Sequence, residues 1–391
     1  MRKIHCKEVL VNRKIFEHDD TSERLFALLD RVEHGGLSFM DDAEMRDYIS
    51  SKPELGDRGG SGIEKSNPVV VFDASRWDGS DLLVSPLDLR RSGDMMSRHG
   101  TVCHDGYNIH TAYGCVNRCS YCCYGDVIYL KIDVDHFMGN LASQVEDVPA
   151  LYKWDNRSDV MEFEPEMGFL PRMAELFSSY SKSCLMVYTK SGDPTEILKL
   201  EPSDQVIFCW TLSMPTQWRH MERGVASTQM RLEAAKQCQL AGHRVRLRLS
   251  PIVPVVGWEK ELDRLIKGIF GYTLKPEVIT LKTLGFMPTL QVFENMMGPV
   301  LQHLDVRFLN SIIDSSPDMK GNRAGPLPDH LREAIYRHAF ESIRWYSDVP
   351  VSICNETPGV WSAMSDVLAI SSGGCCCSNA SVEQFVGVPQ D

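Results

Sequence analysis

The sequence predicts an α/β protein in three parts: a small N-terminal α/β domain (1–105), a core of β/α units over residues 106–300 and a C-terminal extension (301–391). The core is expected to be a doubly wound sheet or a full or partial, (β/α)6-type barrel. Two observations predict this class. Short apolar runs typical of buried strands alternate with amphipathic helical segments from about residue 107, and the pattern turns helical after about residue 305. Repeated β-then-α units produce parallel strands covered by helices, and such folds place their reactive residues at the carboxyl ends of the strands.

The first 105 residues read as a separate unit. A helix is expected over residues 23–32, and the polar, glycine-rich stretch 57–64 predicts a mobile loop. The run Val69–Phe72 predicts a short buried strand.

The central region supplies the strands of the predicted barrel. Helices are expected over residues 227–240 and 258–270; Ser227 is a suitable N-cap and Gly242 a suitable stop for the first of them. A helix over 329–346 and a strand over 349–354 follow, and the tail from Ser371 is expected to lack regular structure. The predicted strands are 107–112, 127–132, 185–189, 205–212, 245–252 and 278–284.

Composition limits the class of protein. The chain has 391 residues, of which 43% are hydrophobic and 24% charged, as in soluble globular proteins. It has neither a secretory signal pattern nor a run of 18 apolar residues, so we expect a cytoplasmic protein without a membrane span. The formal net charge of −12 argues against binding to duplex DNA, because a protein that binds DNA phosphates needs a basic surface.

Thirteen cysteines are the most unusual feature, and seven of them lie in two tight clusters. One contains Cys115, Cys119, Cys122 and Cys123, and the other is the run Cys375–Cys377. Such tight clusters in a reducing cytoplasm favour metal or redox chemistry over disulfides.

The first cluster, Tyr113-Gly-Cys115-Val-Asn-Arg-Cys119-Ser-Tyr-Cys122, follows the predicted strand 107–112. Spacings of four and three residues allow three thiolates to hold one inorganic centre. Three ligands leave one iron of a [4Fe–4S] cluster open to a substrate or cofactor. The alternative is a structural zinc site with His104 or His110 as the fourth ligand.

This C-x3-C-x2-C pattern after a first strand resembles the radical S-adenosylmethionine superfamily. The resemblance implies that Cys115, Cys119 and Cys122 hold a [4Fe–4S] cluster whose open iron chelates S-adenosyl-L-methionine, which is cleaved to a 5′-deoxyadenosyl radical. It places Tyr121 near the adenine. Cys123 is either a spare buried cysteine or a catalytic hydrogen donor beside the cofactor.

Residues 106–270 resemble one branch of the superfamily, the spore photoproduct lyases. The resemblance is found in Val187-Tyr-Thr-Lys190, Glu222-Arg-Gly, Arg231-Leu-Glu-Ala-Ala and Gly257-Trp258-Glu259, in the family's order. It implies that Ser158 and Asp159 bind the cofactor's amino group, and that Lys190 and Ser213 bind its carboxylate. A zwitterionic amino acid needs both an acceptor and a cation. The alternatives are a solvent-exposed lysine and a capping serine.

The resemblance to the DNA-repairing members of this branch does not extend to the residue that donates hydrogen in them. DNA-repairing members have a cysteine two residues before the serine, where this chain has Asn156, and the aromatic and basic C-terminal stretch of those enzymes is absent. With the negative charge, this predicts the same cofactor chemistry on a small molecule, in biosynthesis or in nucleotide or metalloid modification. An electron donor such as flavodoxin or ferredoxin is the expected partner.

The second cluster, Cys375, Cys376 and Cys377, lies on a glycine-flanked segment. We interpret these thiols as catalytic and close to the substrate. They could instead hold an auxiliary metal with Cys354, bind a thiophilic acceptor such as arsenite, or have no role in a disordered tail.

Three rival functions remain open. One is a lyase for DNA lesions that uses Cys123 or a tail cysteine as donor. Another is a transferase that moves the 3-amino-3-carboxypropyl arm of the cofactor to a soft acceptor. The last is a zinc-binding protein without catalysis.

Overall fold

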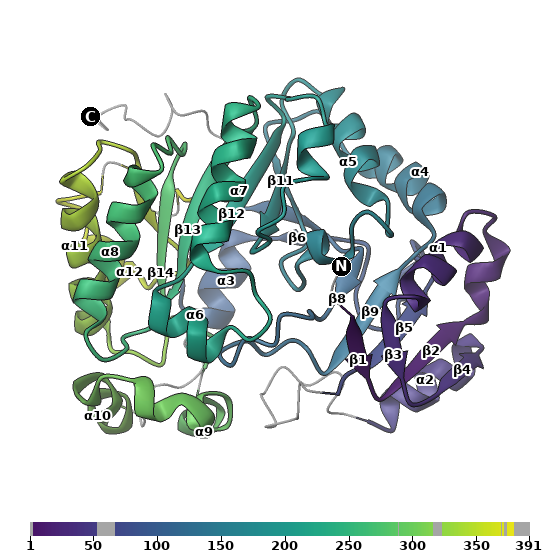
Figure 1. Ribbon diagram of the computed structural model, residues 1–391, viewed down its shortest axis with the longest axis horizontal. Helices are drawn as coiled ribbons and strands as arrows, with labels where there is room; N and C mark the ends of the chain where they lie inside the picture. The colour runs from purple at the N-terminus through teal and green to yellow at the C-terminus, as the bar shows by residue number, and fades with distance from the viewer. Residues whose placement is uncertain are drawn as a thin grey trace.

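The computed structural model describes residues 3–52, 67–287, 289–315, 323–368, 370 and 374–378. Two large sheets dominate the fold, an eight-stranded sheet in the centre and a five-stranded sheet built mainly from the N-terminal part (Figure 1). A small pair, β1 (Ile4–Cys6) and β3 (Val32–His34), lies beside the second sheet. The predicted α/β class is therefore confirmed.

The eight-stranded sheet is open. Its strand order is β15-β14-β13-β12-β11-β10-β7-β6, with neighbouring strands parallel from β15 to β7 and β6 antiparallel to β7. Within the described residues, β6 and β15 form the two edges and do not pair with each other. The strands are β6 (Leu87–Arg90), β7 (Gly106–Ile109), β10 (Leu151–Trp154), β11 (Cys184–Thr189), β12 (Val206–Leu212), β13 (Arg244–Ile252), β14 (Ile279–Thr283) and β15 (Val351–Ile353).

The two faces of this sheet differ in chemistry because side chains alternate along each strand. One face is apolar, with Leu185, Val187 and Leu247 in the main core, and is covered by α5 (Phe169–Ser178), α7 (Thr228–Leu240), α8 (Trp258–Gly271) and α11 (Asp329–Arg344) (Figure 1). The opposite face packs against Cys375–Cys377, and we call it the tail-covered face. It consists of Lys153, Met186, Tyr188, Cys209, Arg246, Arg248, Thr280, Lys282, Ser352 and Cys354.

The five-stranded sheet corrects the strand assignment. It has the order β4 (Leu37–Met40), β2 (Glu8–Asn12), β5 (Val69–Asp73), β9 (Val127–Lys131), β8 (Ala112–Tyr113). The predicted second barrel strand, 127–132, is β9 and pairs with β5, and the predicted strand 107–112 is divided between β7 and β8 in different sheets. The position beside β7 belongs to β10, a strand that the sequence pattern does not predict. A fully buried run such as β9 looks the same in either sheet, and only its pairing partner distinguishes them.

The main helix predictions are confirmed. The predicted helices 23–32, 227–240, 258–270 and 329–346 correspond to α1, α7, α8 and α11, and the strand 349–354 to β15. Ser227 accepts a hydrogen bond from the Met230 N–H as the predicted N-cap. The predicted loop 57–64 lies outside the described residues, as does the tail beyond Ser378. Of the predicted helices, α1 spans Thr21–Leu29. The other helices are α2 (Asp42–Ser50), α3 (Ser92–His99), α4 (Val134–Gln144), α6 (Pro215–Met221), α9 (Leu290–Met297), α10 (Val306–Asp314) and α12 (Pro358–Ala363).

No helix among the described residues has the length and apolar character needed to cross a bilayer.

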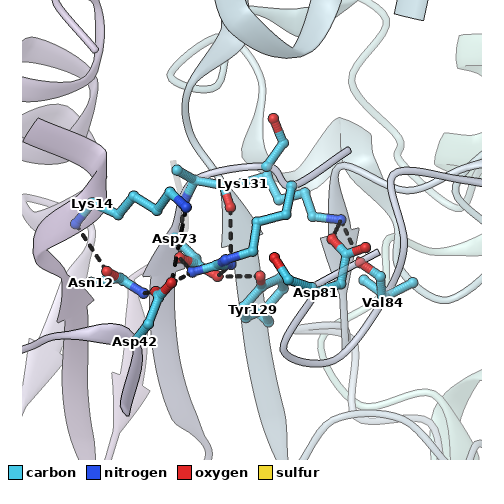
Figure 2. A network of polar contacts seen from close by, with 12 residues as sticks. Asn12, Lys14, Asp42, Asp73, Asp81, Val84, Tyr129 and Lys131 are labelled. Atoms are coloured by element: carbon cyan, nitrogen blue, oxygen red, sulfur yellow. Dashed lines mark hydrogen bonds and ion pairs between the residues drawn. The ribbon is translucent and has the colours of Figure 1, made fainter. Parts of the chain in front are cut away.

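A buried polar network ties β5, β9 and α2 together (Figure 2). Asp73, at the end of β5, is fully buried and accepts hydrogen bonds from the Arg76 guanidinium and the Tyr129 hydroxyl. Arg76 also pairs with Asp42, which in turn accepts a hydrogen bond from Asn12 at 2.7 Å. Because both Asp73 and the Arg76 side chain are removed from water, each charge depends on the other for compensation.

We predict that Asp73→Ala destabilises the protein by about 3 kcal/mol, because it leaves the buried Arg76 guanidinium with one carboxylate fewer. Asp135→Ala is the matched control: it removes the Asp135–Arg172 pair, whose side chains are 61% and 46% exposed, and should cost below about 1 kcal/mol. Urea denaturation measures both. Equal losses would show that the buried network does not stabilise the smaller sheet.

Candidate active site at the cysteine loop

The cysteine loop connects β8 to β9 and is held in place from both sides. Gly114 has φ +85°, and a Cβ there would lie 1.7 Å from the Val127 carbonyl oxygen, so only glycine lets the loop leave β8. On the other side the Ser120 N–H donates to the Met221 carbonyl at 2.8 Å, and Cys119 forms an isolated β-bridge with Glu222. The loop is thus fixed against the end of α6.

Backbone N–H groups point at the sulfur atoms of this loop. The Asn117 N–H donates to Cys115 Sγ at 3.4 Å, and the Tyr124 N–H donates to Cys122 Sγ at 3.5 Å. Burial raises the pKa of Cys115 well above its usual value, and burial likewise raises the pKa of Cys119 to about 11. The thiols therefore need a bound metal centre to become thiolates, and the N–H donors then stabilise the sulfur charge.

The spacing of the thiols bears on the kind of metal centre. Among the described residues, Cys115, Cys119 and Cys122 are not a group whose Sγ atoms all lie within 4.8 Å of one another. A single zinc ion, with Zn–S bonds of about 2.3 Å, holds its thiolates about 4 Å apart. The arrangement fits a larger centre, such as a cluster whose irons each take one cysteine.

Glu222 is the centre of the polar network beside the loop. Its fully buried carboxylate accepts hydrogen bonds from Lys190 Nζ at 2.9 Å, from Ser213 Oγ at 2.7 Å, from Arg231 and from the Tyr121 hydroxyl. Lys190 Nζ also lies 3.9 Å from Cys119 Sγ and 2.7 Å from the Tyr121 hydroxyl oxygen. One carboxylate thereby joins the cysteine loop to the ends of β11 and β12 and to α7.

The charges of this network reinforce one another. Burial opposes ionisation of Glu222, but Lys190 and Arg231 overcome it and hold the pKa of the carboxyl far below its usual range. Burial also opposes the charge on Lys190, yet Cys119 and Glu222 raise its pKa above the ordinary lysine value. Lys190 is therefore a permanent cation within reach of the loop sulfurs.

Ser158 and Asp159 follow β10 and face the same region. The Asp159 carboxylate accepts hydrogen bonds from the Thr189 hydroxyl at 2.9 Å and the Lys190 N–H at 2.7 Å, and burial raises its pKa. The Asn117 amide contacts it from the cysteine loop at 3.4 Å. The buried Ser158 Oγ has no hydrogen-bond partner in the described part of the chain. An unsatisfied buried hydroxyl next to Asp159 in the chain fits a site that takes a polar ligand.

The structure brings most predicted site residues together. Tyr121, Asp159, Lys190 and Ser213 are joined to the cysteine loop by the contacts above, whereas Cys123 packs against the main apolar core. The tail cysteines form a separate group on the tail-covered face, where the Tyr188 hydroxyl is 2.9 Å from Cys377 Sγ. Asn156 contacts Asn108 at 3.3 Å.

Sequence reasoning missed two residues of the site, Glu222 and Arg231. Both lie in segments that carried the family resemblance, Glu222-Arg-Gly and Arg231-Leu-Glu-Ala-Ala, but neither was given a role. The available signal was a glutamate and an arginine inside otherwise buried stretches, which must be paired to be buried.

Comparison with known proteins shows which proteins this chain is similar to. Residues 100–284 match the profile of the family "Spore photoproduct lyase". The spore photoproduct lyase of Clostridium acetobutylicum is 23% identical over 203 residues, which are 49% of this chain and 59% of the relative. That of a Geobacillus species is 22% identical over 179 residues, 42% of this chain and 52% of the relative. The alignments thus span just over half the length of these relatives.

Solved structures show that the fold is shared over a longer span. A cysteine-to-alanine mutant of spore photoproduct lyase with dinucleoside spore photoproduct has a TM-score of 0.65 at 15% identity, covering 90% of this chain and 99% of that protein. A double mutant with bound AdoMet and the same dinucleoside has a TM-score of 0.64 at 14% identity, with the same coverage.

The fold and the three-cysteine site agree with the predicted class, the radical S-adenosylmethionine enzymes, and one of the similar structures contains bound AdoMet. Within this class the chain resembles the spore photoproduct lyase branch, as its sequence predicted.

We predict that Glu222→Gln destabilises the iron-free protein by about 3 kcal/mol at pH 7, because Lys190 and Arg231 lose their shared counter-charge. The folded-state pKa of Glu222 is depressed, so its stabilisation is complete above the unfolded value of about 4.3 and is lost as the pH falls below it. The difference between wild type and variant in urea denaturation should therefore shrink below about pH 4.5.

Ser213→Ala serves as the control, since it removes a neutral donor to the same carboxylate and leaves both ion pairs. Its effect should be near about 1 kcal/mol and should change little with pH. A Glu222→Gln effect that stays constant down to about pH 3.5 would contradict the assigned charge state.

Proposed function

We propose that this chain is a radical S-adenosylmethionine enzyme that cleaves its cofactor reductively at the cysteine loop. The observation that carries this proposal is the permanently charged Lys190, held by Glu222 within 3.9 Å of Cys119 Sγ. Cys115, Cys119 and Cys122 would hold the cluster, which with S-adenosyl-L-methionine supplies a 5′-deoxyadenosyl radical. An electron donor such as flavodoxin or ferredoxin is proposed as the partner.

The surrounding residues would bind the amino-acid part of the cofactor. Lys190 offers a cation to its carboxylate, and Ser213 reinforces the same end through Glu222. Asp159 and the unsatisfied Ser158 hydroxyl are acceptors for its ammonium group. Tyr121, next to the third cluster cysteine, would pack near the adenine. These roles are supported by the contacts that join Asp159, Lys190 and Ser213 to the loop or to Glu222 beside it.

The open sheet from β7 to β14 is proposed to act as the partial barrel of this enzyme, with its chemistry at the carboxyl ends of the strands. Lys190 follows β11 and Ser213 follows β12, in agreement with that placement. Cys123, in the cysteine loop, is the thiol proposed to lie near the substrate.

A small molecule is the first candidate substrate. The net charge of −12, the asparagine at position 156 and the tail cysteines packed on the sheet all support it. A small molecule does not need the basic surface on which duplex DNA binding depends.

A nucleic-acid lesion is the second candidate. The matched relatives are named spore photoproduct lyases, and two related structures hold a dinucleoside photoproduct.

Anaerobic reconstitution tests the radical assignment. The protein with iron, sulfide, reductant and S-adenosyl-L-methionine should be brown and release 5′-deoxyadenosine, and Cys119→Ala should abolish the release by removing a cluster ligand. Release of methylthioadenosine would indicate transfer of the aminocarboxypropyl arm instead. A colourless zinc protein that leaves the cofactor intact would refute the proposal. Added dinucleoside photoproduct should be repaired only if the second candidate substrate is correct.

A binding experiment tests Lys190. Lys190→Met should weaken S-adenosyl-L-methionine binding to the reconstituted protein about 10- to 100-fold, because a charge-assisted hydrogen bond to the cofactor carboxylate is lost. Iron content should be unchanged. Lys199→Met, at a lysine whose side chain is 63% exposed, is the control and should bind normally. Unchanged affinity in Lys190→Met would remove Lys190 from the cofactor site.

A further inference from the structure

A second group of thiols, separate from the cysteine loop, lies on the tail-covered face. The Sγ atoms of Cys375, Cys376 and Cys377 all lie within 4.8 Å of one another, and all three residues are buried. Cys354, just after β15, shares a side-chain hydrogen bond with Cys375. We call these four residues the tail thiol group. Cys209, on β12, lies beside it in contact with Cys376.

The tail is fixed in this position by polar side chains from three strands. The Cys376 N–H donates to Thr280 Oγ1 at 2.9 Å, and the Arg246 guanidinium donates to the Cys376 carbonyl at 2.7 Å. The Ser352 hydroxyl donates to the Gly374 carbonyl. These contacts come from β14, β13 and β15, so three neighbouring strands of the sheet bind residues 374–378 through specific hydrogen bonds.

The turn that carries the thiols is itself arranged around sulfur. The Cys377 N–H donates to Cys375 Sγ at 3.4 Å, and the Ser378 N–H donates to the Cys375 carbonyl at 2.9 Å. N–H···S bonds of this kind stabilise sulfur that carries negative charge. The same pattern occurs at Cys115 and Cys122 in the cysteine loop.

Cationic side chains lie around the tail thiol group, and some of their buried nitrogen atoms have no hydrogen-bond acceptor among the described residues. Arg248 interacts electrostatically with Cys354, Cys376 and Cys377, and Arg90 interacts with Cys375 and Cys377. Lys282 lies near Cys354. Arg248 Nε, Arg90 Nη2 and Lys282 Nζ are buried and have no hydrogen-bond partner among the residues described. Glu356 offsets the charge of Lys282, but the groups that interact most strongly with Arg248 and Arg90 are thiols and the Tyr188 hydroxyl. Buried cations without anionic partners are costly, so these two arginines favour negative charge at the thiols.

We propose that Cys354, Cys375, Cys376 and Cys377 bind one zinc ion. Four thiolates around one Zn²⁺ ion form a tetrahedral centre with Zn–S bonds of about 2.3 Å and a formal charge of about −2. The Sγ atoms of Cys375, Cys376 and Cys377 are spaced for a single ion, and Cys354, which lies beside Cys375 but not within 4.8 Å of all three, would move in to complete the site. The negative charge of the centre compensates Arg248 and Arg90. Zinc thereby fastens the tail to β13, β14 and β15.

This site changes how the tail cysteines enter the chemistry. A zinc-bound thiolate has no S–H bond, so the tail thiol group cannot donate hydrogen. Tyr188, whose hydroxyl contacts Cys377 Sγ, precedes Lys190 by two residues on the same face of β11 and its extension, a separation of about 7 Å along the strand. The zinc site thus supports the sheet next to the cofactor residues, and Cys123 remains as the thiol candidate near the substrate.

Cobalt substitution tests the site in the full-length chain. In a Cys115→Ser/Cys119→Ser/Cys122→Ser background, which removes the iron cluster, one equivalent of Co²⁺ should give the visible absorption of tetrahedral thiolate coordination, and Zn²⁺ should displace it. Adding Cys375→Ser, Cys376→Ser and Cys377→Ser should abolish these bands. Metal binding should also release protons, because the thiols ionise. This measurement is independent of cofactor cleavage, so its failure leaves the proposed function standing.

Two controls make the result specific. Cys238→Ser removes a buried thiol on α7, outside the group, and should leave the cobalt bands intact. His136→Gln disrupts the other close set of metal-ligand side chains, His18, Asp133 and His136, and should also leave them intact. Should the tail variant unfold, Cys376→Ser alone must lower zinc affinity at least about 100-fold in protein of normal circular dichroism. Cobalt bands that survive loss of the tail cysteines, or no thiolate bands at all, would overturn the proposal.

Discussion

The burial of one carboxylate organises the candidate active site. Glu222 has no exposed side-chain surface, and it lies between two cations, Lys190 and Arg231. A buried charge without partners would cost several kcal/mol, so each of these residues fixes the others. Through this constraint the cysteine loop, the end of β11 and the start of α7 are held in one relative position. Of the residues proposed to bind the cofactor, Tyr121, Lys190 and Ser213 are therefore preorganised by their hydrogen bonds with Glu222.

A second constraint arises from the alternation of side chains in the eight-stranded sheet. One face is apolar and is covered by helices, so it contributes to the core in the ordinary way. The other face has arginine and lysine at alternate positions of β13 and β14, and Arg246 and Lys282 are buried there. Such a face is stable only when something anionic and hydrogen-bonding covers it. The cysteine-rich tail, with its carbonyls on Arg246 and its sulfurs near Arg248, meets that requirement.

These two constraints explain which features the sequence could and could not predict. Helices such as α7 and α8 follow from local periodicity and caps, which are properties of the segment itself. The assignment of β9 to the second sheet depends on its partner β5, more than fifty residues earlier, and no local pattern contains that information. The cysteine loop was predictable because its spacing is local. The role of Glu222 was not, because its importance comes from contacts with residues as distant in the sequence as Tyr121 and Lys190.

The two cysteine groups of this chain show how spacing selects an inorganic centre. In the cysteine loop, three thiols separated by three and two residues do not gather their sulfurs within 4.8 Å of one another, which agrees with a cluster that has an open iron. In the tail, three consecutive cysteines in a tight turn gather their sulfurs within 4.8 Å, which suits one tetrahedral ion closed by Cys354. An open centre can take a substrate or cofactor, whereas a closed centre can only hold structure. The proposed cluster therefore belongs to the chemistry, and the proposed zinc site to the fold that supports it.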